Sequence, residues 1–208
     1  GEKRVAIDFL GGRIVDEVRF RTTLPAETLE RAIQFFRPFV TSGQVSAIGI
    51  GSFGPLDLNP KSATYGFITS TPKPGWGNTN VLGTIQQALR VKAGLDTDVN
   101  VAALGESIWG ASKGHDPSLY LTIGTGIGGG YVKDGRSLIG MLHPEMGHLR
   151  IPHNREADPF PGSCPFHGDW LEGLASGPAI QQRSGMRGQD LSGTDLEATV
   201  ELEAFYLG

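Results

Sequence analysis

Short apolar runs alternate with amphipathic stretches along most of the chain. Two runs rich in β-branched residues, 4–10 and 13–21, flank a Gly-Gly pair, a spacing that predicts a two-stranded hairpin with its turn at residues 11–12. Apolar residues then recur at helical spacing over about 25–42, after a proline suited to a helix start. The chain is therefore expected to open with a hairpin and a covering helix.

The middle of the chain repeats strand and helix. Residues 45–50 form a continuous apolar run typical of a buried strand, and residues 51–77, rich in glycine, proline and serine, are predicted to form a long loop. A helix over about 81–91, a short strand around Val99 and a helix over about 102–112 follow. This alternation predicts a protein of the α/β class.

The last part of the chain is expected to contain more loop than regular structure. Residues 119–123 form a core-strand pattern, and residues 131–132 and 137–138 flank an Asp-Gly turn signal. Residues 139–173 are predicted to be mostly loop, and apolar spacing predicts a last helix over about 196–206.

Composition narrows the classes of function. A net charge of -4 provides no basic field for nucleic acid, and no apolar run approaches the roughly 18 residues that a membrane helix needs. A single cysteine, Cys164, excludes an intramolecular disulfide framework. The expectation is a cytoplasmic protein with neither a nucleic-acid nor a membrane partner. The 31 glycines indicate many tight turns and close backbone approaches, as where loops wrap a phosphate or a sugar.

A glycine-rich segment, Gly-Thr-Gly-Ile-Gly-Gly-Gly, follows the strand predicted at 119–123. It fits the dinucleotide spacing G-x-G-x-x-G, but that motif requires a helix next, whereas a strand and a hairpin turn follow here. A Walker loop requires Gly-Lys-Ser/Thr, which is absent. Two interpretations remain, a glycine hairpin without a ligand, and a hairpin whose amides and threonine hydroxyl hold ATP phosphates. The candidate phosphate-binding residues are Gly124, Thr125, Gly126, Gly128 and Gly129.

Four motifs follow one another in the order found in ROK sugar kinases. Asp-Thr-Asp-Val-Asn at 96–100 precedes Gly-Glu at 105–106, the segment 122–130 comes next, and Glu-Met-Gly-His lies at 145–148. The chain therefore resembles that family over nearly its whole length. Thr-Pro-Lys-Pro-Gly-Trp at 71–76, and Glu-Gly at 172–173 in the segment 164–173, resemble its bacterial fructokinase branch in particular.

The resemblance implies an actin-like ATPase fold of ribonuclease H-like type. Residues 1–98 would form the N-terminal lobe and residues 99–208 the C-terminal lobe, with a hexose in the cleft between them and magnesium-ATP against the glycine hairpin. Family members often form homodimers. They also begin with a further glycine-rich phosphate hairpin and end with a second adenosine-binding motif, so both ends are expected to be truncated here, in an excerpt of a longer enzyme or in a fragment.

The resemblance assigns Asp98 as the catalytic base, which would accept the proton of the sugar 6-hydroxyl as that oxygen attacks the γ-phosphate. Without the neighbouring motifs, an aspartate before a helix could equally cap its N-terminus. Four other residues match sugar ligands of the family. Each one taken alone could be a surface residue whose polar atoms are hydrogen-bonded to neighbours or water. Carboxylates and amides suit hexoses because they engage adjacent hydroxyls. The loop at residues 52–55 is expected to close over the sugar and adds two candidates. The candidate sugar-binding residues are Gly54, Pro55, Asn100, Glu145, His148 and Glu172.

The resemblance also implies a structural zinc, with His148, Cys164 and His167 as ligands. Trp170 stands where the fructokinase branch has a further cysteine, and tryptophan offers no metal ligand. Water, His153 or Asp169 could take the fourth position. The alternative is a metal-free loop in which Trp170 packs on apolar surface.

The expected activity is ATP-dependent phosphorylation of D-fructose to fructose 6-phosphate. Glucose or mannose is the nearest rival acceptor. The second class of function is transcriptional repression, because the family has a repressor branch. Members of that branch carry an N-terminal helix-turn-helix, and no such segment precedes residue 1 of this sequence. The third is a non-catalytic sugar-binding fragment, which would not require Asp98.

Overall fold

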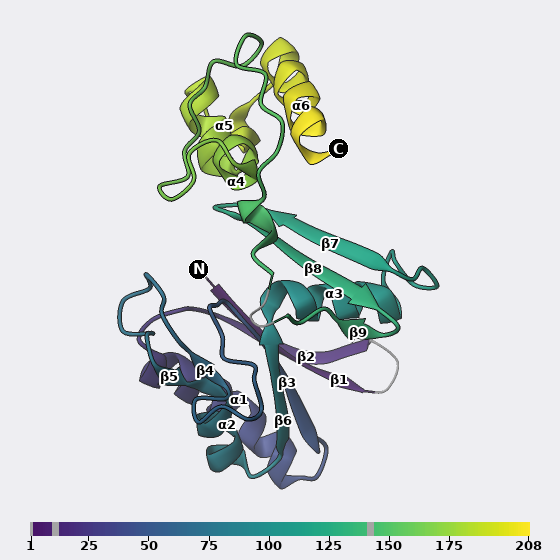
Figure 1. Ribbon diagram of the computed structural model, residues 1–208. Helices are drawn as coiled ribbons and strands as arrows, with labels where there is room; N and C mark the ends of the chain where they lie inside the picture. The colour runs from purple at the N-terminus through teal and green to yellow at the C-terminus, as the bar shows by residue number, and fades with distance from the viewer. Residues whose placement is uncertain (1, 10–12, 141–143) are drawn as a thin grey trace.

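The computed structural model describes residues 2–9, 13–140 and 144–208. Its first elements are the strands β1 (Glu2–Phe9) and β2 (Arg13–Arg21), which pair antiparallel as the sequence predicts (Figure 1). The turn predicted at residues 11–12 lies outside the described residues.

Two helices pack together beside a parallel strand pair (Figure 1). The strands are β3 (Ala47–Ser52) and β6 (Lys92–Thr97), and the helices are α1 (Pro25–Thr41) and α2 (Val81–Leu89). α1 begins with proline at its first turn, where the missing N–H costs nothing. The buried residues that join helices and strands are Ile33, Ile48, Ile85 and Leu89. Both predicted helices and the predicted strand are therefore confirmed.

The long loop after β3 is more ordered than its composition indicates. It contains β4 (Phe67–Ile68), which pairs antiparallel with β5 (Thr79–Asn80). Its apolar side chains are buried, Ile68 at 0% and Trp76 at 3% exposure, and the Trp76 indole Nε1 donates a hydrogen bond to the Thr23 carbonyl oxygen at 2.9 Å. The prediction of an irregular loop over 51–77 was thus incomplete, because scattered apolar residues give it a core of its own.

The helix α3 (Asp98–Trp109) begins directly at the end of β6. The short strand predicted around Val99 was wrong, and the helix predicted over 102–112 begins four residues earlier than expected. The reason is a cap, since the Thr97 hydroxyl accepts a hydrogen bond from the Asn100 backbone N–H at 3.2 Å. This cap overrides the strand preference of the two valines in the first turns.

The glycine-rich segment joins two antiparallel strands, β7 (Ser118–Ile123) and β8 (Ile127–Lys133). A third strand, β9 (Arg136–Ser137), follows the turn in which Asp134 and Gly135 have φ of 52° and 69°. The hairpin interpretation is confirmed, and the dinucleotide interpretation is excluded because a strand follows the glycines. α3 packs against β7 and β8.

Short helices form the last part of the chain, shown in green and yellow in Figure 1. They are η1 (Met146–His148), α4 (Leu171–Ala175), α5 (Gly177–Ser184), η2 (Gly188–Asp190) and α6 (Gly193–Leu207). α6 confirms the last predicted helix. α5 was not predicted, because Gly-Pro at its start is typical of a loop, whereas here the Ser176 hydroxyl caps a helix. In the described part of the chain, no helix combines the length and apolar character that crossing a membrane requires.

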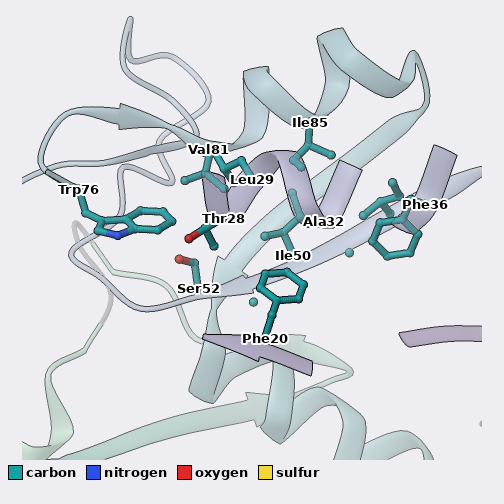
Figure 2. Close-up of a pocket in the computed structure, with 13 residues that line it drawn as sticks. Phe20, Thr28, Leu29, Ala32, Phe36, Ile50, Ser52, Trp76, Val81 and Ile85 are labelled. Atoms are coloured by element: carbon teal, nitrogen blue, oxygen red, sulfur yellow. The ribbon is translucent and has the colours of Figure 1, made fainter. Parts of the chain in front are cut away.

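An apolar cavity of about 160 Å³ lies between α1, α2 and β3, with Phe20 of β2 on its wall (Figure 2). Its lining is mostly aliphatic and aromatic, and the hydroxyls of Thr28 and Ser52 also face it. A hexose needs many polar partners for its hydroxyls. The cavity is therefore poorly suited to a sugar, and it shares no lining residue with the cleft described next.

Candidate active site

Asp98 lies in a cleft of about 200 Å³. The loop after β3, the junction of β6 with α3, the glycine strand β8 and the segment before η1 all contribute to its wall. The lining residues are Gly54, Pro55, Thr97, Asp98, Val99, Gly128, Gly129, Pro144, Glu145 and Met146. The structure thus brings together six of the candidate residues, namely Gly54, Pro55, Asp98, Gly128, Gly129 and Glu145.

The carboxylate of Asp98 is presented at the first turn of α3. One oxygen, Oδ1, accepts a hydrogen bond from the Val99 backbone N–H at 3.0 Å, and the residue is exposed on the cleft wall. The helix cap is Thr97, so capping is not the role of Asp98. Its second oxygen, Oδ2, accepts no hydrogen bond from the described residues and can act as a proton acceptor for a hydroxyl in the cleft.

Asp96 holds this turn in place, a role that the sequence did not reveal. Its Oδ1 accepts hydrogen bonds from the Thr97 N–H at 2.7 Å and the Asn100 Nδ2 at 2.8 Å, and its Oδ2 accepts one from the Ser137 hydroxyl at 2.6 Å. The carboxylate therefore joins β6, α3 and β9 directly behind Asp98. The available signal was a second aspartate two residues before the first, at the end of a strand.

Asn100 is not among the residues that line the cleft. Its side chain is buried, at 1% exposure, and donates to Asp96. Its Oδ1 has no hydrogen-bond partner among the described residues. The assignment of Asn100 as a sugar ligand stays a prediction, while its observed contact is with the support of Asp98.

Glu172 and His148 lie beside the hairpin but do not line the cleft. Glu172 Oε2 accepts a hydrogen bond from the Ile127 N–H at 2.9 Å, and its Oε1 is 4.0 Å from His148 Nε2. The two side chains remain about a quarter exposed. Glu172 therefore connects the first residue of β8 to the segment that carries Glu145, and the assignment of both residues as sugar ligands stays a prediction.

The glycines of the hairpin fall into two groups. A Cβ atom at Gly128 would lie 2.8 Å from Val99 Cγ1, and one at Gly129 would lie 2.5 Å from Met146 Sδ. These positions need glycine because α3 and η1 pack directly on the strand. A Cβ atom at Gly124 would meet no atom within 4 Å among the described residues, and Thr125 beside it is exposed. Gly124 and Thr125 are therefore the part of the hairpin with room for a phosphate, whereas a Cβ atom at Gly126 would lie 2.6 Å from Glu172 Oε2. Phosphate binding at this turn stays a prediction.

His148, Cys164 and His167 come together as the sequence predicts, with ligand atoms within 4.8 Å of one another. The two Nδ1 atoms are 3.0 Å apart, and each lies 3.9 Å from the Cys164 Sγ. Nitrogen and sulfur atoms bound to one tetrahedral zinc are separated by about 3.3 to 3.6 Å, from usual bond lengths of about 2.0 and 2.3 Å. The three side chains therefore fit three corners of a zinc site.

The fourth corner has no protein ligand among the described residues. The Trp170 ring stacks on His167, with centroids 4.1 Å apart and an angle of 14°. His153 is committed elsewhere, since its Nδ1 lies 3.0 Å from Asp169 Oδ2 and its Nε2 lies 2.9 Å from the Asp158 carbonyl oxygen. Asp169 is likewise engaged by His153 and Arg155. Water is the remaining ligand of those considered from the sequence.

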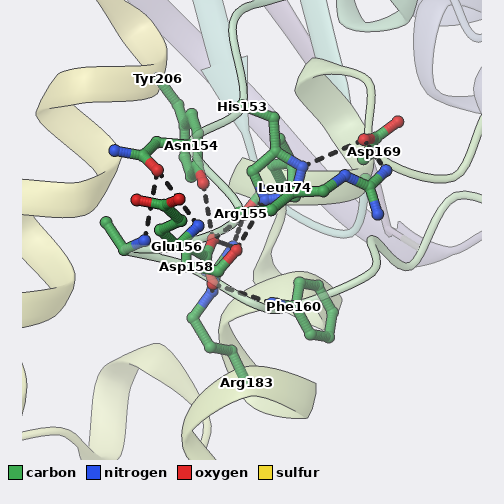
Figure 3. A network of polar contacts seen from close by, with 12 residues as sticks. His153, Asn154, Arg155, Glu156, Asp158, Phe160, Asp169, Leu174, Arg183 and Tyr206 are labelled. Carbon is green, nitrogen blue, oxygen red and sulfur yellow. Dashed lines mark hydrogen bonds and ion pairs between the residues drawn. The ribbon is translucent and has the colours of Figure 1, made fainter.

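A polar network fastens the loop at residues 149–170, between η1 and α4, to the last helices (Figure 3). Asp158, on the loop, accepts hydrogen bonds from the Tyr206 hydroxyl at 2.6 Å and the Arg183 Nε at 3.2 Å. Burial raises the pKa of Asp158, but the hydrogen bonds from Tyr206, the Phe160 N–H and Arg183 outweigh it and hold that pKa below its usual range. The ion pair with Arg183 therefore ties the loop to α5, and the hydrogen bond from Tyr206 ties it to α6.

Glu203 on α6 faces the same arginine from the other side. Its Oε1 is 3.8 Å from Arg183 Nη1, and neither carboxylate oxygen has a hydrogen-bond partner among the described residues. Burial raises the pKa of Glu203 to about 7, and the charge of Arg183 opposes that rise. The carboxyl group is thus poised to titrate near neutral pH.

Comparison with known proteins identifies the family. The sequence pattern of the ROK family matches residues 3–204. The chain belongs to the ROK family. A Bacillus subtilis relative is 50% identical over 196 residues, 94% of this chain and 63% of its own length. A fructokinase of Lactococcus lactis subsp. cremoris is 48% identical over 88% of this chain and 60% of its own length. The resemblance inferred from the motifs is confirmed, and this ROK protein spans less than two thirds of either relative.

The fold class is also confirmed. The crystal structure of a ROK hexokinase from Thermus thermophilus superposes with a TM-score of 0.78, at 28% sequence identity, over 98% of this chain and 71% of that one. The actin-like α/β fold expected for ROK proteins is therefore present here. The division into lobes at residues 98 and 99 stays a prediction.

Proposed function

We propose that this ROK protein transfers the γ-phosphoryl group of magnesium-ATP to the 6-hydroxyl of a hexose, with D-fructose as the preferred acceptor. The observation that carries the proposal is the placement of the Asp98 carboxylate in a cleft beside Glu145 and the glycine strand. Relatives named as fructokinases, at 48% and 46% identity, support the choice of sugar.

In the proposed reaction, Asp98 accepts the proton of the 6-hydroxyl while that oxygen attacks the γ-phosphorus. Phosphoryl transfer needs little covalent work from the protein, so positioning and charge neutralisation provide most of the rate. Asp96 keeps the base in place from behind. The Gly124 amide donates within the turn to the Gly126 carbonyl oxygen at 2.9 Å, so the amides of Thr125 and Gly126 and the Thr125 hydroxyl would be offered to the phosphates. Glu145 would engage sugar hydroxyls.

We further propose a partial structural zinc site formed by His148, Cys164 and His167, in which water as fourth ligand binds the ion less tightly than a further thiolate would. The ion would fix the loop that precedes Glu172, because two of its three ligands lie on that loop. The support is the N₂S donor set and its spacing. No step of the transfer passes through this ion.

The function is tested by replacing Asp98 with Asn. The amide keeps the shape but cannot take the proton, so turnover should fall by roughly 10²- to 10⁴-fold while fructose affinity stays within about tenfold. ADP release measures turnover and calorimetry measures sugar binding. Asp195→Asn, at an exposed position in the first turn of α6, is the matched control and should behave as the unmodified chain. Comparable turnover in the Asp98 variant would remove the base assignment.

The choice of sugar needs a separate assay. Fructose should exceed glucose and mannose in kcat/KM by at least roughly tenfold, which requires only about 1.4 kcal/mol of differential transition-state binding. If glucose or mannose equals fructose, the protein is a hexokinase of broader or different preference, and the role of Asp98 is unaffected.

A further inference from the structure

The cleft around Asp98 has an unbalanced charge. Among the described residues, its lining includes two carboxylates, Asp98 and Glu145, and no lysine or arginine. A transferring phosphoryl group brings further negative charge into the same space. Such groups are held in proteins by magnesium together with lysine or arginine side chains. A basic side chain supplied from just outside the cleft lining would meet this requirement.

Lys73 is such a side chain. Its Nζ lies 3.3 Å from the centre of the Phe53 ring, and Phe53 directly precedes two residues of the cleft wall, Gly54 and Pro55. A lysine this close to an aromatic face is attracted by the negative charge of that face. The ring contact thus holds the ammonium group over the residue that precedes the cleft wall.

The platform under Lys73 is rigid. The Phe53 ring meets the Trp76 ring edge-on, with centroids 5.2 Å apart and an angle of 74°. Trp76 is 3% exposed and hydrogen-bonded through its indole N–H (Figure 2 shows its place beside β3). The backbone N–H of Trp76 donates to the Lys73 carbonyl oxygen at 3.2 Å, which closes a turn between the two residues. The lysine backbone is therefore fixed while its exposed side chain can adjust to a ligand.

The ammonium group also lies within electrostatic range of the proposed base. Although the side chain as a whole is exposed, partial desolvation of its ammonium group lowers the pKa of Lys73, and the negative charge of Asp98 opposes that shift. In the proposed reaction the phosphorus is attacked by the oxygen whose proton Asp98 accepts. A cation near Asp98 is consequently near the phosphoryl group as well.

We propose that Lys73 is a further catalytic residue of this site, which binds the phosphoryl group as it passes from ATP to the sugar. The inference rests on the proposed function. The bond from phosphorus to the sugar 6-oxygen forms as the bond to the β–γ bridging oxygen breaks, the 6-hydroxyl proton goes to Asp98, and ADP leaves. Lys73 forms no covalent bond and donates hydrogen bonds to the non-bridging phosphoryl oxygens.

Two ligands separate this role from simple packing. Fructose 6-phosphate carries the phosphoryl group, whereas fructose is neutral, so only the former should depend on the lysine charge. Lys73→Met keeps the unbranched side chain on the Phe53 ring and removes the charge. Lys73→Arg keeps both the charge and the ring contact. Lys61→Met, at an exposed position of the same loop, is the matched control.

Calorimetry on the 208-residue chain is the test. Lys73→Met should weaken fructose 6-phosphate binding about tenfold, as expected for loss of a hydrogen bond to a charged group, and should change fructose binding less than about twofold. Lys73→Arg should restore most of the loss, and the Lys61 variant should match the unmodified chain. In the ATP assay, kcat/KM for fructose should fall about tenfold in the Lys73→Met variant.

The outcomes distinguish the inference from the function. Equal weakening of both ligands, no weakening of either, or no binding of fructose 6-phosphate by the unmodified chain would overturn the role of Lys73. If the unmodified chain binds fructose 6-phosphate in a Lys73-dependent manner but transfers no phosphoryl group from ATP, the proposed function fails and the phosphoryl contact of Lys73 stands.

Discussion

Replacing Glu203 with Gln tests how the buried network of the last helices responds to pH. The Glu203 side chain is 14% exposed and faces Arg183 at 3.8 Å. Burial raises its pKa from 4.5 to about 7. Between these two values the folded chain keeps a proton that the unfolded chain has released, so the free energy of unfolding falls as pH rises through this range. The corresponding contribution is about 3 kcal/mol, at 1.36 kcal/mol for each pH unit between the two pKa values.

Gln cannot titrate, so the variant should lack this loss. Urea unfolding at several pH values between 5 and 8 gives the free energy of unfolding of each protein. Relative to the unmodified chain, Glu203→Gln should gain about 2 to 3 kcal/mol of stability between pH 5 and pH 8. Histidine titrations occur in both proteins and cancel in the difference. Glu201→Gln, exposed on the same helix, should show no such gain. Parallel pH profiles for the Glu203 variant and the unmodified chain would refute the reasoning.

Three further predictions concern the site and its supports. Trp170→Cys should add the missing thiolate and raise the zinc content of the purified protein from well under one equivalent toward one, and metal analysis that finds a full equivalent before mutation would contradict this. Gly130→Ala should destabilise the fold by roughly 1 to 3 kcal/mol, because its Cβ would collide with the Val99 carbonyl oxygen, and an unchanged urea midpoint would show that the strand can move. Asp96→Ala should lower kcat more than it raises KM for fructose, because the first turn of α3 loses its support, whereas a change in KM alone would assign Asp96 to sugar binding.

Local patterns were sufficient for much of the fold. The proline start and apolar spacing of α1 predicted a helix that the structure places at Pro25–Thr41. The Asp-Gly turn after the glycine segment correctly indicated a strand pair rather than a nucleotide-binding helix. Such features depend on residues close in sequence, so a single sequence can reveal them.

Contacts between distant residues were harder to predict. The start of α3 depends on the Thr97 cap, which competes with a valine-rich pattern that favours a strand. The burial of Asn100 against Asp96 depends on Ser137 and β9, which lie about 40 residues away. The links from Asp158 to α5 and α6 span 25 and 48 residues and carry no motif. In the sequence alone, nothing distinguishes these side chains from ordinary polar residues of the surface.

The position of His148 couples two parts of the molecule through one ring. Its Nδ1 belongs to the three-ligand cluster, and its Nε2 faces Glu172, which in turn holds the first amide of the glycine strand. A metal bound at Nδ1 leaves the ring hydrogen on Nε2, so the carboxylate then always faces a donor. Metal loading and ligand affinity at the hairpin are therefore expected to be reciprocal. A ligand that binds more tightly to the metal-loaded chain must, by the same factor, raise the affinity of the chain for the metal, as measured in equilibrium competition with a chelator.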